Sequence, residues 1–389
     1  MKISTLAKNI APSVTLSITA KAKEMKKQGV DVVSFAAGEP DFDTPLFIKE
    51  AAKKAIDEGF TKYTATSGIL ELKEAIVKKL FEENNLKYTP KEILVTNGAK
   101  QALFNIIMTL VDKDDEVIVP VPYWVSYVEM IKMAQGKPVF LKTKDFIIDS
   151  DLLEKTITKK TKLLILNSPN NPTGAVYDEK ILEKIAKICV KHNLLVISDE
   201  IYEKLVYDKK HVSIASLSEK IKNLTVVING VSKTYAMTGW RIGYAAGPEE
   251  VIKAATKIQD HSTSNPSSIS QKAALAALTL EQSTVAKMVL EYKKRRDFMM
   301  SGLSLIKNIY PFYPHGAFYV FVNVKKLYQK GIKNSVDFCQ RLLDEAYVAA
   351  IPGVAFGDDS YIRLSFATDI QSIKKGLERL KNFCERIGN

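Results

Sequence analysis

The stretch LTVVINGVSKTYAMTGWRIG, from Leu224 to Gly243, decides how this chain is interpreted. An apolar run typical of a buried strand ends at Ile228, and small residues on both sides of Lys233 leave room for a ligand. An ammonium beside a buried cation such as Arg241 has a lowered pKa and can act as a Schiff-base nucleophile. Taken alone, a solvated lysine in a Gly/Ser loop is the more common explanation, so the rest of the chain has to decide.

Alternating strand and helix patterns surround this stretch, from about residue 90 to residue 250. This alternation predicts a largely parallel sheet covered by helices. In such a sheet ligands bind at the carboxyl ends of the strands, and the notable polar residues fall at those ends. The predicted strands are 93–95, 116–119, 163–166, 194–198 and 225–228, with helices over 101–110 and 179–191.

The predicted fold class is α/β, with a large domain built on a mostly parallel, helix-covered sheet and a smaller α+β domain built from the N- and C-terminal segments. We expect residues 1–45 to belong to the small domain, residues 46–285 to form the large ligand-binding domain, and residues 286–389 to complete the small domain. The elements expected outside the large sheet are a long charged helix over 280–310, strands at 318–322 and 362–365, and helices near 15–27, 335–346 and 370–387.

The composition of the 389 residues, with 46% hydrophobic and 26% charged, is ordinary for a globular protein. No apolar run reaches membrane-spanning length and the N-terminus lacks a signal-peptide core, so we expect no membrane association. Three widely spaced cysteines indicate reduced thiols in a cytoplasm and no metal site. The net charge of +12 is spread along helical segments without a nucleic-acid-binding motif, which favours a solvated surface over nucleic-acid binding.

Two polar motifs follow predicted strands. In TNGAKQ, residues 96–101, small residues such as Gly98 and Ala99 expose N–H groups at a helix start, which suits a phosphate, although a plain strand-to-helix turn fits equally well. In NSPNNPTG, residues 167–174, two prolines force a tight, extended backbone, and a cis peptide before Pro172 would present Asn171 to a ligand.

Two further motifs carry charge into apolar runs. A carboxylate at the end of a buried strand is costly unless paired, so Asp199 in SDEIY is a candidate partner for a protonated ring nitrogen, within reach of Tyr202. The alternative is a helix N-cap at Asp199 with Tyr202 in the core. Arg363, alone in the run YIRLS, is shaped for bidentate carboxylate binding, unless it points to solvent from an exposed strand face.

These motifs, in this order and spacing, resemble the fold-type I pyridoxal-phosphate aminotransferases over essentially the full chain, and most closely the aspartate aminotransferase subgroup of bacteria and archaea. The segment AAGEPDFDTP, residues 36–45, is similar to the N-terminal signature of that subgroup. The resemblance implies a transaminase that uses pyridoxal 5'-phosphate and acts on small amino and 2-oxo acids by a ping-pong mechanism, as a homodimer with shared active sites. The implied reaction converts L-aspartate and 2-oxoglutarate into oxaloacetate and L-glutamate.

The same resemblance implies roles for individual residues. Lys233 would hold the cofactor as a Schiff base and move the substrate proton. Asp199 would pair with the ring nitrogen, Tyr202 and Asn171 would bind the phenolic oxygen, and Trp124 would stack on the ring. The residues implied at the phosphate are Gly98, Ala99, Lys100, Ser232 and Arg241, together with Tyr63 of the neighbouring subunit.

For the substrate, the resemblance implies that Arg363 binds the α-carboxylate, helped by Asn171, Trp124 and the backbone at Gly38. Lys100 stands where the subgroup has a lysine for the distal carboxylate of aspartate or glutamate. The segment 13–16 would close over the site.

Two positions depart from the pattern of relatives. Ala11 stands where prephenate-using members tend to carry a basic residue, which speaks against prephenate as a substrate. Gly230 stands where many relatives have a phosphate-binding serine, from which we expect weaker cofactor binding, with Ser232 compensating in part. The alternatives are an aminotransferase for aromatic or other amino acids, including prephenate, a carbon–sulfur lyase on the same scaffold, and a DNA-binding regulator with an aminotransferase-like domain. The last would need an additional N-terminal domain, for which the roughly thirty residues before the Gly38 motif leave no room.

Overall fold

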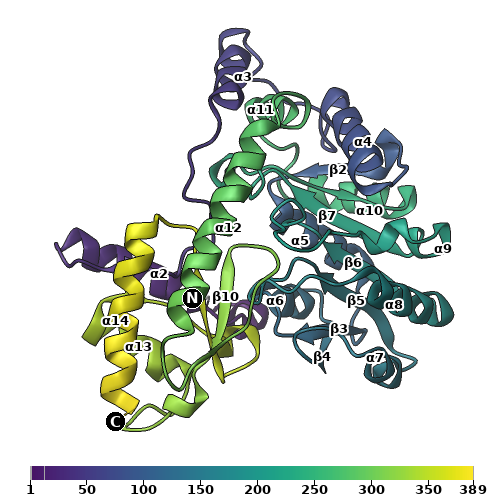
Figure 1. Cartoon of the computed structure of the whole chain (residues 1–389). Coiled ribbons are helices and arrows are strands. Elements are labelled where there is room, and N and C mark those ends of the chain that lie inside the picture. The colour runs from purple at the N-terminus through teal and green to yellow at the C-terminus, as the bar shows by residue number, and fades with distance from the viewer. Residues whose placement is uncertain (1, 13, 389) are drawn as a thin grey trace.

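A seven-stranded sheet forms the centre of the larger lobe in the computed structural model, which describes residues 2–12 and 14–388 (Figure 1). The strand order is β2-β8-β7-β6-β5-β3-β4, and only β8 runs antiparallel to its neighbours. The mostly parallel sheet predicted from the sequence is therefore confirmed. The strands are β2 (Ile93–Thr96), β3 (Glu116–Val121), β4 (Lys137–Lys142), β5 (Thr161–Asn167), β6 (Leu195–Asp199), β7 (Thr225–Gly230) and β8 (Gly243–Ala246).

Helices cover both faces of this sheet because its central strands are apolar on both sides. On β5, Leu163 and Ile165 pack into one hydrophobic cluster, whereas Leu164 packs into another on the opposite face. Side chains of α5, α6 and α10 complete the first cluster, and those of α7 and α8 the second. The helices of this lobe are α3 (Leu46–Asp57), α4 (Leu70–Asn84), α5 (Ala99–Leu110), α6 (Ser126–Met133), α7 (Ser150–Thr156), α8 (Glu179–His192), α9 (Glu219–Lys222), α10 (Glu249–Asp260) and α11 (Ser268–Thr279).

The smaller lobe contains a separate four-stranded antiparallel sheet and, as predicted, combines segments from both ends of the chain. Its N-terminal strand β1 (Val33–Ser34) pairs in parallel with β11 (Val348–Ala349), more than 300 residues later in the sequence. The other elements are α1 (Thr5–Asn9), α2 (Val14–Lys27), β9 (Tyr310–Pro311), β10 (Tyr319–Asn323), α13 (Ser335–Ala346), β12 (Ile351–Pro352), β13 (Tyr361–Ser365) and α14 (Ile370–Gly388).

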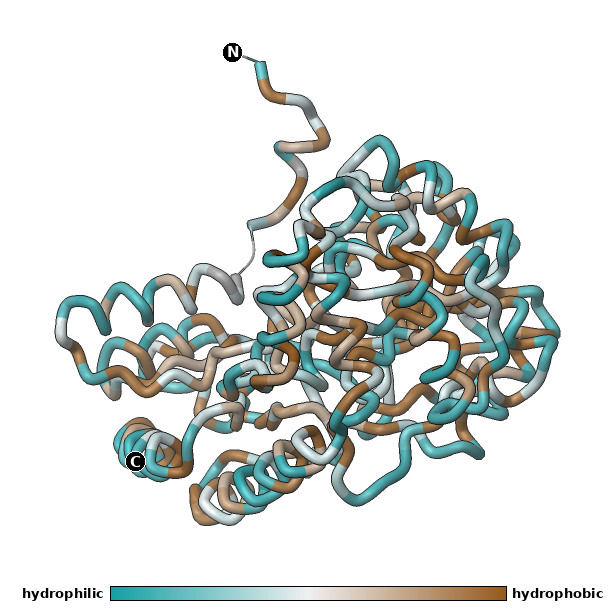
Figure 2. Tube along the Cα trace, turned by 90° about the horizontal axis from the view of Figure 1, so that it is seen from above, coloured by the Kyte–Doolittle hydropathy of each residue, from teal (hydrophilic) through white to brown (hydrophobic). Residues whose placement is uncertain are grey.

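Helix α12 (Ser283–Leu303) runs between the two lobes in Figure 1. Met288 belongs to the hydrophobic cluster of the larger lobe, and Met299 to that of the smaller lobe, so one helix contributes to two cores. The helix is shorter than the expected span of 280–310 because the chain turns after Leu303. Figure 2 shows the segment before α2 reaching out from the body of the molecule. Within the described residues, no helix is long and apolar enough to cross a membrane.

Candidate active site

Polar residues gather where the carboxyl ends of the parallel strands of the larger lobe face the smaller lobe, around a cavity of about 1540 Å³. The parallel registers of β5, β6 and β7 set Asn167 beside Asp199 and Asp199 beside Ile228, one strand end next to another. Most of the site residues expected from the sequence line this one cavity: Gly38, Ala99, Lys100, Trp124, Asn171, Asp199, Tyr202, Ser232, Lys233, Arg241 and Arg363.

Lys233 follows strand β7 and projects into the cavity, where it is partly buried. Its Nζ donates a hydrogen bond to the carbonyl oxygen of Gly38, at 2.6 Å. Burial disfavours the ammonium and lowers the pKa of Lys233 to about 8, against the opposing charge of Glu39 and with the help of the Arg363 guanidinium. A substantial fraction of this amine is therefore neutral, and so nucleophilic, near physiological pH.

Asp199 ends strand β6 and is buried. Its Oδ2 accepts a hydrogen bond from the hydroxyl of Tyr127, at 2.6 Å, and its Oδ1 accepts one from the backbone N–H of Ile201, at 3.3 Å. Burial raises the pKa of Asp199 to about 6, and the Tyr127 hydrogen bond opposes that rise. Residues 201–204 form turns, so the alternative of a helix N-cap at Asp199 is wrong. Tyr202 is buried, as that alternative expected, but its hydroxyl also forms a hydrogen bond with that of Tyr319, at 2.9 Å.

Arg363 lies on β13, which pairs with strands on both sides, so the alternative of an exposed strand face is wrong. The guanidinium is buried and donates hydrogen bonds to Asn171 Oδ1, at 3.0 Å, and to the carbonyl oxygen of Ala36, at 3.1 Å. Its Nε has no hydrogen-bond partner, and among the described residues it forms no ion pair with an acid. A buried cation with an unused donor is suited to a carboxylate ligand, which would restore both charge balance and hydrogen bonding. The rings of Tyr319 and Phe356 flank it, with centroids 4.3 and 5.1 Å from Cζ.

A close approach of glycine backbones forms the end of the cavity near Arg241. A Cβ built on Gly230 would lie 2.8 Å from the Cα of Gly243, its partner on β8, and a Cβ on Gly243 would lie 2.2 Å from the backbone N of Ala99. Gly98, at φ 84°, has no room for a side chain because a Cβ there would lie 2.4 Å from Arg241 Nη2. The start of helix α5 and the guanidinium are thereby held together, an arrangement suited to an anion.

Residues 30–380 match the family described as Aminotransferase class I and II. The chain belongs to this family of aminotransferases. It is 46% identical to the aspartate aminotransferase of Bacillus subtilis (strain 168), over 99% of this chain and 100% of that protein. It is 47% identical to the probable aspartate/prephenate aminotransferase of Rickettsia bellii (strain RML369-C), over 98% of each chain.

Among solved structures, the aspartate aminotransferase from Thermus thermophilus with maleate superimposes on this aminotransferase with a TM-score of 0.94. The two are 43% identical in sequence, and the match covers 98% of this chain and 99% of the other. The fold and the catalytic class expected from the resemblance, a fold-type I transaminase, are confirmed by these comparisons.

One expectation about the backbone of this aminotransferase is wrong. The cis peptides lie at Ser168–Pro169 and Val121–Pro122, and the peptide before Pro172 is not among them. Asn171 is presented instead by a hydrogen-bonded turn, in which its backbone N–H donates to Asn167 Oδ1, at 2.9 Å. The polar turn itself positions the amide, so no isomer is needed at that bond.

The structure also explains the glycine at position 230. Because Gly230 faces Gly243 at backbone contact distance, a serine could not occupy this position without displacing strand β8. Close strand packing therefore requires a glycine at this position of the chain. The weaker cofactor binding inferred from it stays a prediction.

Tyr63 and Gly98 are the expected site residues that do not line the cavity. Gly98 lies directly behind the lining, against Arg241. The Tyr63 ring is 92% exposed, so its predicted role at the site of a partner subunit stays a prediction. Lys100 and Trp124 lie together, with the Lys100 ammonium 5.0 Å from the indole centroid. Burial lowers the pKa of Lys100, and the charge of Arg241 adds to this effect.

The N-terminal segment reaches the same cavity. Ala11 and Pro12 line it, and the backbone N–H of Ala11 donates to Glu129 Oε2, at 3.2 Å. Thr15 lines it as well. Ser13, where the closing segment was expected to begin, lies outside the described residues, and closure of this segment stays a prediction.

Sequence reasoning missed two tyrosines of the site. Tyr127 contacts Asp199, and Tyr319 contacts both Tyr202 and Arg363. Tyr127 lies three residues after Trp124, a spacing that puts both rings on one side of the chain at the start of α6, and this was the available signal. For Tyr319, which lies in an apolar strand 117 residues after Tyr202 and on a different strand from Arg363, the sequence has no comparable signal.

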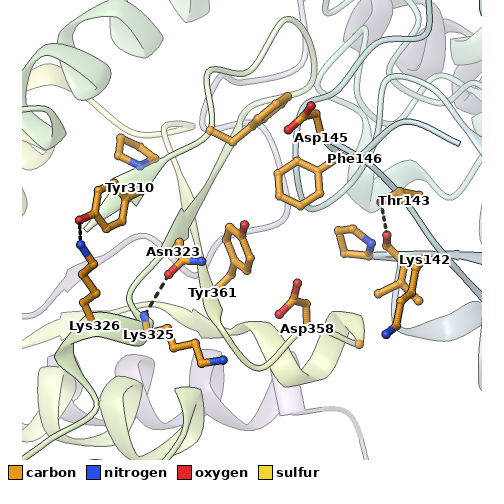
Figure 3. A pocket seen from close by; sticks show the side chains of 15 residues that line it. Lys142, Thr143, Asp145, Phe146, Tyr310, Asn323, Lys325, Lys326, Asp358 and Tyr361 are labelled. Atoms are coloured by element: carbon orange, nitrogen blue, oxygen red, sulfur yellow. Dashed lines mark hydrogen bonds between the residues drawn. The ribbon is translucent and has the colours of Figure 1, made fainter. Parts of the chain in front are cut away.

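A second cavity, of about 960 Å³, lies between the lobes (Figure 3). The Phe146 ring, from the turn after β4, makes edge-to-face contacts with the rings of Phe312 and Tyr361, with centroids 4.8 and 5.4 Å away. None of the site residues expected from the sequence lines this cavity, so it belongs to the contact between the lobes and not to the candidate active site.

Proposed function

We propose that the enzyme is an aspartate aminotransferase that uses pyridoxal 5'-phosphate and transfers the amino group of L-aspartate to 2-oxoglutarate. The observation that carries the substrate assignment is a pair of cations, Arg363 and Lys100, that line the same cavity as Lys233. Neither forms an ion pair with an acid among the described residues. Two separate cationic groups are suited to a substrate with two carboxylates.

The relatives support this assignment. The protein from B. subtilis is named an aspartate aminotransferase, and the T. thermophilus enzyme was solved with maleate, a four-carbon dicarboxylate. Names that include prephenate also occur among relatives of similar identity, such as the R. bellii protein.

The residues present fit pyridoxal phosphate. Lys233 supplies an amine with a lowered pKa, and Asp199 a buried carboxylate for a protonated ring nitrogen. The glycine-lined end of the cavity, with Arg241 and the N–H groups at the start of α5, suits the phosphate, with Ser232 beside it. The residues proposed to bind the cofactor are Lys233, Asp199, Tyr202, Asn171, Trp124, Arg241, Gly98, Ala99, Lys100 and Ser232, with Tyr63 of a second subunit.

When bound, the cofactor supplies an acceptor for the electrons released at the substrate Cα. The chain supplies orientation and proton transfer. Arg363 and Asn171 would hold the α-carboxylate, which fixes the Cα–H bond relative to Lys233. The Lys233 amine would take the proton from Cα and pass it to the cofactor within the same half of the reaction, and would move a proton the opposite way in the second half, acting as general base and then general acid. Asp199, ionised beside a ring cation, would keep the ring nitrogen protonated.

We also propose a cytoplasmic homodimer in which Tyr63 completes the partner's site. The Tyr63 ring is 92% exposed, and Leu46 and Leu70, at 65% and 58% exposed, lie at the starts of α3 and α4 on either side of it in the sequence. A second subunit packed against this part of the chain would cover these exposed apolar side chains.

The experiment that tests the function follows the absorbance of the bound cofactor while one amino acid at a time is added in the absence of a 2-oxo acid. Aspartate and glutamate are expected to convert the cofactor to its amine form, and steady-state kinetics with aspartate and 2-oxoglutarate are expected to give parallel double-reciprocal lines. Conversion by aromatic donors only, or the release of a sulfur product, would instead favour an alternative substrate class. If no amino acid converts the cofactor, the aminotransferase assignment is wrong.

Lys100→Ala separates the dicarboxylate substrates from the alternatives. Removal of the second cation is expected to lower kcat/KM for aspartate about 10- to 100-fold, because a charge-assisted hydrogen bond is lost, while alanine turnover changes little. Lys142→Ala, in the second cavity, removes the same charge away from the site and is the matched control. An equal loss for aspartate and alanine would show that Lys100 does not bind the distal carboxylate.

A further inference from the structure

Two buried glutamates lie directly behind the turn that carries Asp199 and Tyr202. Glu200 follows Asp199 and Glu203 follows Tyr202, and their side chains are only 1% and 5% exposed. Asp199 and Tyr202 line the main cavity, whereas neither glutamate does. The turn therefore carries two side chains for the site and two that lie within the larger lobe.

Glu200 is bound by three side chains of the larger lobe. Its Oε1 accepts hydrogen bonds from the hydroxyls of Ser198, at 2.8 Å, and Ser213, at 2.6 Å. Its Oε2 lies 3.0 Å from His211 Nε2. Ser198 and Ser213 are buried, and the hydroxyl of each donates its hydrogen bond to Glu200. The segment 211–213 thus holds Glu200 from the side away from the cavity.

Glu203 is bound by helix α4. Its Oε1 forms a short ion pair with Lys79, and its Oε2 accepts a hydrogen bond from Asn84 Nδ2, at 2.7 Å. Lys79 is itself 7% exposed on its side chain, so this is a buried ion pair. The charge of Lys79 and these hydrogen bonds lower the pKa of Glu203 to about 2, against the opposing effect of burial. Removing one partner of a buried pair is costly, so this contact holds the end of the turn in place.

The same three side chains, Glu200, Glu203 and His211, are close enough together to hold a metal ion. However, every carboxylate oxygen of the two glutamates already has a hydrogen-bond partner, and the Lys79 ammonium already balances one of the two charges. A metal would have to compete for these oxygens with the Lys79 ammonium and with the hydroxyl and amide donors. The arrangement is therefore better suited to fixing the backbone than to binding an ion.

We propose that Glu200 and Glu203 are positioning residues, which fix the 199–202 turn from behind so that Asp199 and Tyr202 keep one orientation toward the cofactor ring. Backbone hydrogen bonds connect the parts of this turn: Glu200 N–H donates to the Ile228 carbonyl, and Glu203 N–H donates to the Glu200 carbonyl, both at 2.9 Å. A shift of either glutamate would therefore move Asp199 or Tyr202. The inference rests on the proposed function of those two residues.

Ser213→Ala removes one hydrogen bond to Glu200 and nothing in the cavity. It is expected to lower kcat about two- to tenfold, the usual effect of one hydrogen bond, with KM for aspartate unchanged. Ser218→Ala is the matched control, because it removes the N-cap of α9 five residues later and so lowers stability without touching the turn. The melting temperature, the dissociation constant of the cofactor and the pH midpoint of its absorbance are measured for both variants.

A shift of the absorbance midpoint in Ser213→Ala and not in Ser218→Ala would support the proposal. Because that midpoint is measured without any amino acid, it tests positioning even if aspartate is not the substrate. If both variants change only the melting temperature, the role of the network is merely structural and the proposal is wrong.

A second pair of variants tests Glu200 directly. Glu200→Gln keeps the acceptor for both serines and can still bond His211, so its kcat is expected to stay within about twofold of that of the original enzyme. Glu200→Ala removes all of these contacts, so its kcat is expected to fall about 100-fold at a similar KM. Equal kcat in folded Glu200→Ala and Glu200→Gln would overturn the proposal, as would a stoichiometric divalent cation found in the purified holoenzyme. If Glu200→Ala does not fold, the Ser213 variant decides.

Discussion

Burial adjusts the two titratable groups of the site in opposite directions, toward neutral pH. The pKa of Asp199 is raised to about 6 and that of Lys233 is lowered to about 8, because in both cases burial disfavours the charged form. Both groups are thus close to their change of protonation in the range where an enzyme works. Tyr127 moderates the first shift, because its hydrogen bond stabilises the carboxylate.

Tyr127→Phe is expected to change the pH dependence of cofactor binding. Binding to a protonated ring nitrogen requires ionised Asp199, so affinity should fall as the pH is lowered through about 6. Without the Tyr127 hydrogen bond the carboxylate pKa rises further, and the fall should begin at higher pH, with about tenfold weaker binding near pH 6. Fluorescence titration between pH 5 and 8 measures this, with Tyr177→Phe, another buried tyrosine, as the control. Identical pH profiles for the two variants would contradict the assignment of Tyr127.

In the cofactor-free protein, Lys233 is expected to react with a small acylating reagent, and the extent of its labelling should reach half of its maximum near pH 8. The neutral amine is the reactive form, so labelling should rise as the pH increases through that value, well below the ordinary lysine pKa of about 10.4. Peptide mass spectrometry measures the extent of labelling, with exposed lysines such as Lys53 and Lys78 in the same sample as the reference. Labelling of Lys233 that begins only above pH 10 would show that burial does not lower its pKa.

Among the elements, the antiparallel pair β7 and β8 has the strictest packing requirement near the site. Gly230 and Gly243 face each other in register, and the start of α5 lies against Gly243. This contact brings Arg241, Lys233 and the N–H groups of α5 to one end of the cavity. Helix propensity or strand propensity alone would not place a glycine at either position, since glycine weakens a strand.

Gly230→Ser is expected to reduce the free energy of unfolding by about 1–3 kcal/mol, because its Cβ would overlap the backbone at Ile242 and Gly243. Urea unfolding of the cofactor-free protein measures the change. Gly239→Ala is the control, because a Cβ there meets nothing within 4 Å. Stability equal to that of the control would mean that the strands separate at no cost, and the packing argument would fail.

At the scale of the whole molecule, the site is assembled from both lobes. Lys233 and Asp199 follow strands of the larger sheet, Arg363 and Tyr319 come from the smaller sheet, and Gly38 comes from the segment after β1. Tyr63 lies outside this assembly in its own chain. Its proposed role requires a second copy.

Mixing two defective variants tests that role. If Tyr63 serves the partner's site, a dimer of one Lys233→Ala chain and one Tyr63→Ala chain has one complete site and one with both defects. Random exchange of chains should then restore about a quarter of the original activity, since half of the dimers are hybrids with half of their sites intact. The mixture is measured after joint refolding, with each variant refolded alone as the control. No recovery beyond the sum of the two variants would contradict shared sites.

The local chemistry of this protein follows from its sequence alone. Each strand end with its polar residues, and the lysine in its loop of small residues, could be recognised because period-two and helical patterns depend only on neighbours in the chain. Arg363 and Asp199 could be identified as unusual in the same way, since a charge in an apolar run has an evident cost. A family resemblance then related these separate motifs to one site.

The tertiary structure decided which of these groups are paired. The contacts of Tyr127 with Asp199, of Tyr319 with Tyr202, and of Glu203 with α4 all depend on packing between segments that are distant in the sequence. The turn that presents Asn171 and the contact that requires Gly230 are likewise properties of approaching backbones. The sequence specifies the type of each side chain. Its burial and its hydrogen-bond partners arise only when the lobes pack, and these determine its pKa and its orientation.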